Sequence, residues 1–403
     1  HPPADDAGPL HSLSVVELTN AGGQHFDAAT ATHYYSTAAG GTFRVDDAAT
    51  DAGSGVFEVR FPAVSLTGFT HTAANDGTSP YRSNTYTWTA ANTTSPGAQA
   101  IVAEDNALNT SGPSPQLTIT RDVTGPGAFS LSAPGAGAAI RNGQAVSAAP
   151  TDAGAGVASV EFRYCSGATC AYAAGTTIGT PDTNPPYTVS WSGQPADGTY
   201  TLLARATDNV GNTTDSAPRT VTVDNTAPGS ALSVNEGTRP DLQHFDSSTD
   251  TLFYNPVATG DFTVSDAATD AGGVASVDFP ALTDTGFTGT ARSDPTTPYD
   301  SNPYTFTTAN TTAPAPFAVV VADDAGNTTN DSLTFVRDVT GPVAFSLSAP
   351  GAGAAIRNGQ AVSAAPTDAG AGVASVDFPA LADTGFTGAA KSDPSSPFDS
   401  NSY

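Results

Sequence analysis

The chain has 403 residues and carries 13 Lys and Arg against 39 Asp and Glu, a formal net charge of −26. Nucleic acids and anionic membranes attract basic patches, so this charge argues against both as partners and is compatible with divalent cations. Gly and Pro number 40 and 31, but short alternating apolar runs recur, which indicates a turn-rich β protein rather than a disordered chain. No apolar run in this segment is long enough to span a membrane.

Four related pentapeptides of the pattern Asp-x-x-[Gly/Ala]-Pro recur along the chain, at Asp5–Pro9, Asp122–Pro126, Asp224–Pro228 and Asp338–Pro342. Successive copies are roughly 100 to 120 residues apart, a recurrence that predicts tandem modules. The predicted divisions are a lead-in linker at 1–8, a long domain at 9–125, a short domain at 126–227, a second long domain at 228–341 and a partial domain at 342–403.

The first two modules contain short runs in which apolar and polar residues alternate, as in half-buried strands. In the first module the expected strands include Leu13–Val15, Thr42–Val45, Phe57–Phe61, Tyr86–Trp88, Ala100–Val102 and Leu117–Ile119. In the second they include Val160–Tyr164, Tyr187–Trp191, Leu202–Ala206 and Val221–Val223. About seven strands per module, separated by turn signals, are typical of a β-sandwich.

The third module repeats the first, since Gln24–Asp27 reappears as Gln243–Asp246, and the fourth copies the second as far as Val376. After Phe378 the fourth module follows the third and reaches Tyr403 without its last strands. Such a module is expected to expose part of its core and unpaired strand edges. We favour the interpretation that the sequence is a window on a longer array; the alternative is that a neighbouring chain donates strands.

Several motifs follow one another in order: Thr-Asp-Ala-Gly-x-Gly-Val, then Asp-Gly-Thr-Tyr, which the two long modules lack, then Ala-x-Asp-x-x-Gly-Asn and Val-x-Asp-x-Thr-x-Pro. Together they resemble the bacterial Ig-like domains that occur in tandem in secreted and cell-surface proteins, including adhesin stalks. The resemblance is strongest over 126–227, weaker over 9–125 and 228–341, and limited to the front half over 342–403. It implies an all-β chain of immunoglobulin-like sandwiches in an extended array, outside the cell and without catalysis.

The Ig strand order would bring together the joint Asp, the Asp of Thr-Asp-Ala-Gly and the Asp of Asp-x-x-Gly-Asn, because their loops share one end of the sandwich. Three crowded carboxylates repel one another unless a cation lies among them, and Ca²⁺ prefers such oxygen ligands. Asn212 and Asn327 could add oxygens. The alternative is that these Asp residues only cap turns. The candidate sets are Asp5 or Asp6 with Asp51 and Asp105; Asp122 with Asp152 and Asp208; Asp224 with Asp270 and Asp323; and an incomplete set of Asp338 and Asp368.

Two cysteines, Cys165 and Cys170, lie five residues apart and are expected to form a disulfide, as is usual in secreted proteins. No hydrolase or metalloprotease motif is found, so we expect no enzyme activity. Tyr34 and Tyr35 are considered as exposed residues on which a sugar could stack.

These observations favour a structural protein, a segment of an extracellular fibre or adhesin stalk, with Ca²⁺ stiffening the joints. The expected partners are further Ig-like modules of the same or neighbouring chains, including self-assembly into a fibre. The alternative function is an accessory or ligand-binding region of a larger secreted enzyme or surface receptor.

Overall fold

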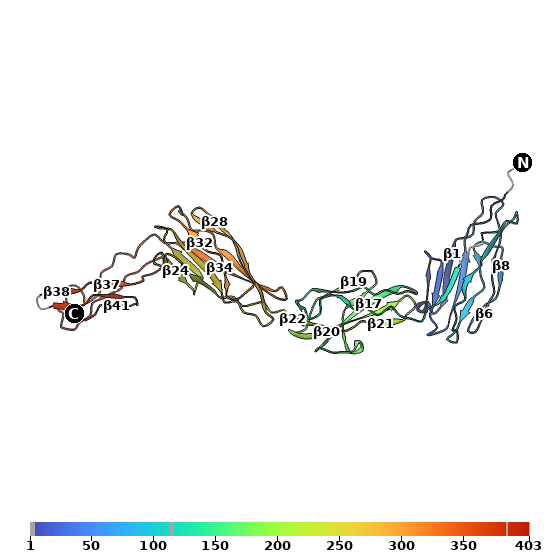
Figure 1. The fold of residues 1–403 in the computed structure, drawn as a ribbon, viewed down its shortest axis with the longest axis horizontal. Coiled ribbons are helices and arrows are strands. Elements are labelled where there is room, and N and C mark those ends of the chain that lie inside the picture. Colours follow the sequence, from blue (N-terminus) through green and yellow to red (C-terminus); the bar gives the residue numbers. More distant parts are fainter. Residues whose placement is uncertain (1–4, 113–116, 384–385, 403) are drawn as a thin grey trace. The chain divides into compact units, whose positions relative to one another are not determined.

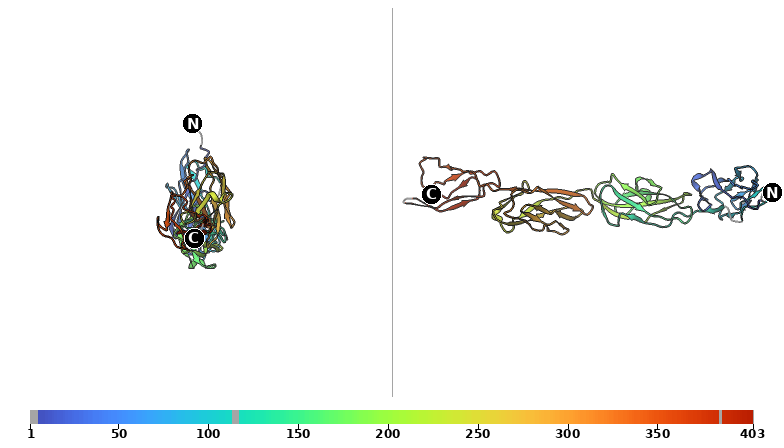
Figure 2. Two further views of the ribbon diagram at one scale, coloured as in Figure 1. Left: turned by 90° about the vertical axis from the view of Figure 1, so that its left-hand side faces the viewer. Right: turned by 90° about the horizontal axis from the view of Figure 1, so that it is seen from above.

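The computed structural model describes residues 5–112, 117–383 and 386–402, so residues 1–4 of the predicted linker lie outside the described residues. The chain forms two compact units, residues 1–225 and 226–403. Strands dominate both units (Figures 1 and 2), which confirms the predicted all-β class. The helices among the described residues are single 3₁₀ turns, and none of them has the length and hydropathy needed to cross a membrane. They are Ala21–Gly23, Tyr172–Ala174 and Pro240–Leu242.

The described residues of the first module form three sheets. One sheet has the strand order β1 (Leu13–Thr19), β4 (Gly41–Asp47), β10 (Tyr86–Trp88), β7 (Phe69–His71) and β6 (Val64–Leu66), with β9 (Tyr81–Arg82) also paired to β4. The second has the order β11 (Gly97–Gln99), β13 (Leu117–Arg121), β3 (Thr32–Tyr35) and β2 (Gln24–Asp27). The third has the order β12 (Val102–Asp105), β5 (Val56–Phe61) and β8 (Ala74–Asp76).

The second module has two sheets. The smaller contains β14 (Leu131–Ala133), β16 (Gln144–Ala148) and β19 (Tyr187–Trp191). The larger contains β15 (Ala139–Ile140), β22 (Arg219–Val223), β20 (Gly198–Asp208), β17 (Val157–Ser166) and β18 (Thr176–Asp182), with β21 (Thr213–Asp215) paired to β20. Buried side chains from both sheets form one cluster, as in a sandwich.

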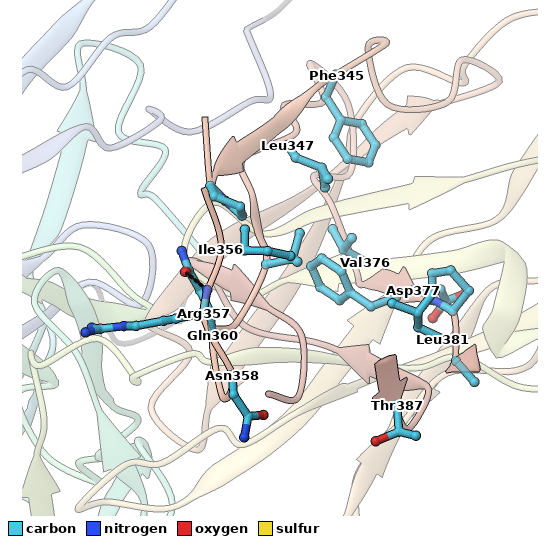
Figure 3. A pocket seen from close by; sticks show the side chains of 15 residues that line it. Phe345, Leu347, Ile356, Arg357, Asn358, Gln360, Val376, Asp377, Leu381 and Thr387 are labelled. Carbon is cyan, nitrogen blue, oxygen red and sulfur yellow. Dashed lines mark hydrogen bonds between the residues drawn. The ribbon is translucent and has the colours of Figure 1, made fainter. Parts of the chain in front are cut away.

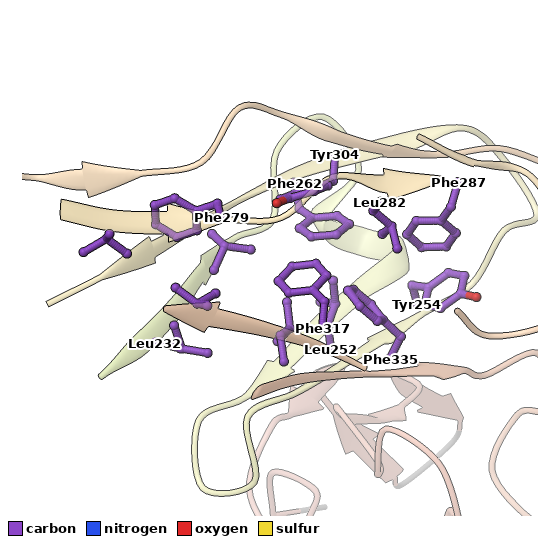
Figure 4. Packing of buried hydrophobic residues seen from close by; sticks show 14 of the residues in the cluster. Leu232, Leu252, Tyr254, Phe262, Phe279, Leu282, Phe287, Tyr304, Phe317 and Phe335 are labelled. Carbon is purple, nitrogen blue, oxygen red and sulfur yellow. The ribbon is translucent and has the colours of Figure 1, made fainter. Parts of the chain in front are cut away.

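The third module also has two sheets. One runs β23 (Leu232–Asn235), β26 (Gly260–Asp266), β32 (Tyr304–Phe306), β29 (Phe287–Gly289) and β28 (Leu282–Asp284), with β31 (Tyr299–Asp300) paired to β26. The other runs β24 (Gln243–Asp246), β25 (Thr251–Tyr254), β34 (Thr328–Arg337), β33 (Phe317–Asp323), β27 (Val274–Phe279) and β30 (Arg292–Asp294). Figure 4 shows aromatic rings such as Phe262, Phe287 and Phe335 meeting between them.

In the part of the fourth module that the structure describes, short strands form three small sheets. They are β35 (Leu347–Ala349), β36 (Ser363–Ala364) and β41 (Phe398–Asp399); β37 (Val376–Phe378) with β40 (Lys391–Asp393); and β38 (Leu381–Asp383) with β39 (Phe386–Gly388). Its buried cluster is smaller than those of the other three modules.

The fourth module leaves apolar side chains open to solvent. Leu347 and Ile356 are 55% and 51% exposed, whereas the equivalent Leu131 and Ile140 of the second module are each 2% exposed. In the second module Ile140 lies on β15, which pairs with β22, and the described residues of the fourth module contain no strand equivalent to β22. The uncovered side chains line a pocket of about 730 Å³ (Figure 3).

Most predicted strands coincide with observed ones, but two expectations about the first module are wrong. Ala100 and Ile101 lie between β11 and β12, because the chain crosses there from one sheet to another. Tyr35 is fully buried, with its hydroxyl donating to Asn92 Oδ1 at 2.8 Å, so it cannot serve as an exposed platform for a sugar. Trp88, in the same core, is also buried.

Candidate metal centre

The first acidic cluster joins three chain segments at one end of the first module. Asp5 precedes β1, Asp51 lies in the loop between β4 and β5, and Asp105 ends β12. Each carboxylate offers one oxygen, and these three oxygens lie within 4.8 Å of one another. Asp6, the other candidate at this joint, is exposed and is not part of the cluster.

The same carboxylates also organise the loops that carry them. Asp51 Oδ2 accepts hydrogen bonds from the backbone N–H groups of Gly53 (3.0 Å) and Gly55 (2.8 Å), and Asp5 Oδ2 accepts one from Ser54 (2.6 Å). Burial raises the pKa of Asp105, but hydrogen bonds, above all from Asn109, outweigh it and hold this pKa below its ordinary value. A carboxylate oxygen has more than one lone pair, so capping a loop and binding a cation are compatible.

The second cluster repeats this arrangement with Asp122, Asp152 and Asp208. Asp122 follows β13, Asp152 lies between β16 and β17, and Asp208 ends β20; again one oxygen from each lies within 4.8 Å of the others. Asp122 and Asp208 are 4% and 2% exposed. Burial raises the pKa of Asp208, and the negative charge of Asp122 adds to this effect, whereas hydrogen bonds from Asn212 oppose it. The negatively charged carboxylates of this cluster therefore repel one another at a site that is largely shielded from solvent.

The glycine of the Thr-Asp-Ala-Gly motif allows the joint carboxylate to approach the loop closely. A Cβ atom on Gly154 would lie 2.1 Å from Asp122 Oδ2, which accepts a hydrogen bond from the next residue, Ala155, at 2.8 Å. Gly53 is in the same relation to Asp5. Any larger residue would displace the carboxylate, so this glycine is needed for the cluster to form.

An asparagine four residues after the last Asp of each set stabilises that carboxylate. Asn212 Nδ2 donates to Asp208 Oδ2 at 2.7 Å, and Asn327 Nδ2 donates to Asp323 Oδ2 at 2.7 Å. Both residues are predicted metal ligands, but here they present the amide nitrogen to the carboxylate. Asn109 makes the same contact at 2.8 Å and is absent from the predicted ligands, although the Asp-to-Asn spacing of four residues identifies it.

The remaining predicted residues lie as follows. Asp224, 5% exposed, follows β22 in the first unit, whereas Asp270 and Asp323 belong to the second. Asp270 Oδ1 accepts backbone hydrogen bonds from Gly272 (2.6 Å) and Gly273 (3.1 Å). In the fourth module Asp338 Oδ2 accepts from Ala371 N at 2.9 Å, and Asp368 Oδ1 accepts from Gly370 N at 2.7 Å.

The two cysteines are joined by a disulfide between the end of β17 and the following hairpin tip. The chain then turns through Tyr172, and two guanidinium groups lie over its ring. The Cζ atoms of Arg163 and Arg205 lie 4.4 and 4.1 Å from the ring centroid. These cation–π contacts hold the loop on the sheet surface.

The first module also contains an Asp–His–Ser arrangement, which the sequence motifs do not reveal. His11 Nδ1 lies 2.5 Å from Asp47 Oδ2, and its Nε2 lies 2.8 Å from Ser111 Oγ. All three residues are largely buried, and Ser111 Oγ accepts a hydrogen bond from Ala103 N at 3.0 Å. Ser216 of the second module makes the equivalent backbone contact without a histidine, so we interpret Ser111 as structural.

No curated protein matches the chain at a significant level. Among solved structures, fibronectin(III)-like modules of Clostridium thermocellum CbhA are 23% identical over 52% of this chain and 93% of theirs, with a TM-score of 0.32. A structure of a 1.5-MDa bacterial ice-binding adhesin is 16% identical over 83% of this chain and 100% of its own, with a TM-score of 0.29. Residues 168–225 match the family model of the bacterial Ig-like domain, which confirms for this part of the chain the resemblance drawn from its motifs.

Proposed function

We propose that the chain is a non-catalytic structural protein, a segment of an extracellular fibre or adhesin stalk whose joints are stiffened by Ca²⁺. The observation that carries this proposal is the repeated three-aspartate cluster. It occurs where the chain enters the first module and again where it passes from the first to the second. In the second cluster the joint residue, Asp122, is the first residue after the last strand of the preceding module.

The donor set fits a hard divalent cation. Ca²⁺ takes six to eight oxygen ligands, and each cluster offers three carboxylates to which backbone carbonyls and water could be added. A bound cation would offset the repulsion that the buried pair Asp122 and Asp208 experiences. The net charge of −26 also favours attraction of cations to the chain.

The second cluster would couple two modules mechanically. Asp122 belongs to the linker that leaves β13, whereas Asp152 and Asp208 belong to loops of the second module. A cation bound by all three would tie the linker to the module that follows and restrict hinging at the joint. Each module has its own buried cluster, so such ties would add stiffness without merging the modules into one core.

Calcium binding can be tested on the second module through Trp191, which is buried there, in a chain whose other tryptophan is replaced (Trp88→Phe). We expect Ca²⁺ at 100 times its dissociation constant to raise the free energy of unfolding of this module by about 2.7 kcal/mol, and chelator to reverse the effect. Asp152→Asn should reduce the gain. Asp182→Asn is the matched control, since Asp182 caps a turn through Asn184 and Thr188 but belongs to neither cluster.

Equal stability in calcium and in chelator would refute the calcium site. The mechanical function has its own test, in which small-angle scattering of the chain is compared in the two conditions. Calcium should narrow the distribution of maximum dimensions, and Asp152→Asn should abolish the change. Calcium that stabilises the module but leaves the distribution unchanged would contradict its function in stiffening.

A further inference from the structure

Four rings lie in contact through the core of the first module, with a histidine at each end. The His33 ring centroid is 4.1 Å from that of Phe43, Phe43 stacks on Tyr86 at 4.7 Å, and Tyr86 stacks on His71 at 3.7 Å. The four residues come from strands β3, β4, β10 and β7, so the row connects two of the sheets of this module.

The third module has the same strands but no histidine in this row. Phe262 and Tyr304 form the equivalent central pair, with centroids 5.3 Å apart. The two end positions are taken by Leu252, which is fully buried on β25, and by Gly289 on β29. The third module is therefore a natural reference for the effect of the two histidines.

His33 has no hydrogen-bond acceptor that could stabilise its protonated ring among the described residues. Its side chain is fully buried, and neither ring nitrogen has a hydrogen-bond partner among the described residues. On the adjacent strands it lies opposite Phe26 of β2 and Ile119 of β13. The titratable group that acts on it is His25 of β2, which would repel a second positive charge. Burial, with a smaller contribution from His25, lowers the pKa of His33 to about 3.

His71 has a partner on one side only. Its Nδ1 donates to the carbonyl oxygen of Pro62 at 2.7 Å, while Nε2 is buried without a partner. The facing groups are Val64 of β6 and Tyr86 of β10, whose hydroxyl is also buried and unbonded. A second proton on His71 would meet no carboxylate there, and burial lowers the pKa of this side chain, although backbone contacts at Pro62 and Asn84 oppose the effect.

We propose that the first module is an acid-sensitive element: mildly acidic pH shifts its equilibrium toward the unfolded chain, in which His33 and His71 take up protons, whereas the third module lacks both histidines and is not shifted in this way. Protonation in the folded state would place a charge in an apolar core with no acceptor. The chain avoids this cost by unfolding, which exposes both rings to water. This inference does not depend on calcium, because neither His33 nor His71 belongs to an acidic cluster.

The direction of the effect follows from the His33 pKa, which folding lowers from 6.5 to about 3. The contribution of His33 to the free energy of unfolding is fully present above pH 6.5. It is lost as pH falls from 6.5 toward 3, because in this range the unfolded chain binds a proton on this side chain and the folded chain does not. At pH 5 this single group multiplies the unfolding equilibrium constant by about 30, and any folded pKa below about 4 gives nearly the same factor. His71 should add to it. His11 has a different environment, because the Asp47 carboxylate lies beside its Nδ1.

The test uses the full chain with Trp191→Phe, so that Trp88 alone reports unfolding of the first module, in chelator to exclude calcium. Denaturant unfolding is compared at pH 7 and pH 5. We expect the unfolding constant of the module to rise at least 30-fold at the lower pH. His33→Leu, which copies Leu252, should remove about 30-fold of this rise, while His25→Gln, a partly exposed histidine in the same module, should leave the rise in place.

The converse variant, Leu252→His, should transfer acid sensitivity to the third module. Hydrogen exchange of β26, corrected for the intrinsic rate at each pH, then shows the loss of protection at pH 5, which the unmodified third module does not show. The proposal is overturned if His33→Leu retains the full pH dependence. It is also overturned if the unmodified third module loses protection as much as the first at pH 5.

Discussion

Replacing Asn92 should lower the free energy of unfolding of the first module more than replacing most of its other polar residues. It is fully buried after β10, where its Oδ1 accepts the hydroxyl of Tyr35 at 2.8 Å and its Nδ2 donates to the carbonyl of Thr67 at 3.1 Å. In the third module Asn310 holds Tyr254 and Thr285 in the same way, at 2.8 and 3.0 Å. The side chain thus adds hydrogen bonds among three segments, those of Tyr35, Thr67 and Asn92 itself.

The change Asn92→Ala removes both hydrogen bonds and leaves the Tyr35 hydroxyl and the Thr67 carbonyl without their partner. Each lost bond costs about 1 kcal/mol, and the cavity left by the amide adds about 1 kcal/mol. We therefore expect the free energy of unfolding of the first module to fall by about 3 kcal/mol. Tyr35→Phe alone should cost about 1 kcal/mol and couple to Asn92→Ala by a similar amount.

Denaturant unfolding followed by Trp88 fluorescence measures this loss, in chains that carry Trp191→Phe. Trp88 is a suitable reporter because its ring centroid is 5.4 Å from that of Tyr35 in the same core. Asn84→Ala is the matched control: this asparagine is exposed, and its loss should cost less than about 0.5 kcal/mol. Equal costs for the two asparagines, or strict additivity with Tyr35→Phe, would refute the argument that Asn92 is a buried anchor.

Two further predictions concern the third and second modules. Gly289→Ala should destabilise the third module by about 2 kcal/mol, because the new Cβ would lie 2.0 Å from the Tyr304 ring. Hydrogen exchange of β26 measures this loss. The control is Gly341→Ala, which should be neutral because a Cβ there would have no neighbouring atom within 4 Å. Reducing the disulfide between Cys165 and Cys170 should cost the second module about 2 kcal/mol, since the loop it closes is short. Unfolding with and without reductant tests this, and a double Cys→Ser variant that still responds to reductant would contradict it.

The elements that sequence reasoning identified are those encoded by neighbouring residues. Tyr187–Trp191 is predicted and observed as one strand because its alternation places Tyr187 and Trp191 on the same buried face. The acidic loops were also recognisable, since Asp and Gly at fixed spacing specify a turn that bonds to its own backbone, as Asp152 does to Gly154 and Gly156.

The sequence by itself therefore determined the all-β class and the acidic turns, because period-two alternation and turn chemistry act over a few residues. The expectation that these turns meet at one end of a module came from the strand order that the resemblance to Ig-like domains implies. Only the tertiary structure decided which residues meet across sheets. It brought His11, Asp47 and Ser111 together, buried Tyr35, and placed His33 in an apolar core. Such contacts join strands that are tens of residues apart, and they depend on register and sheet order, which no local pattern specifies.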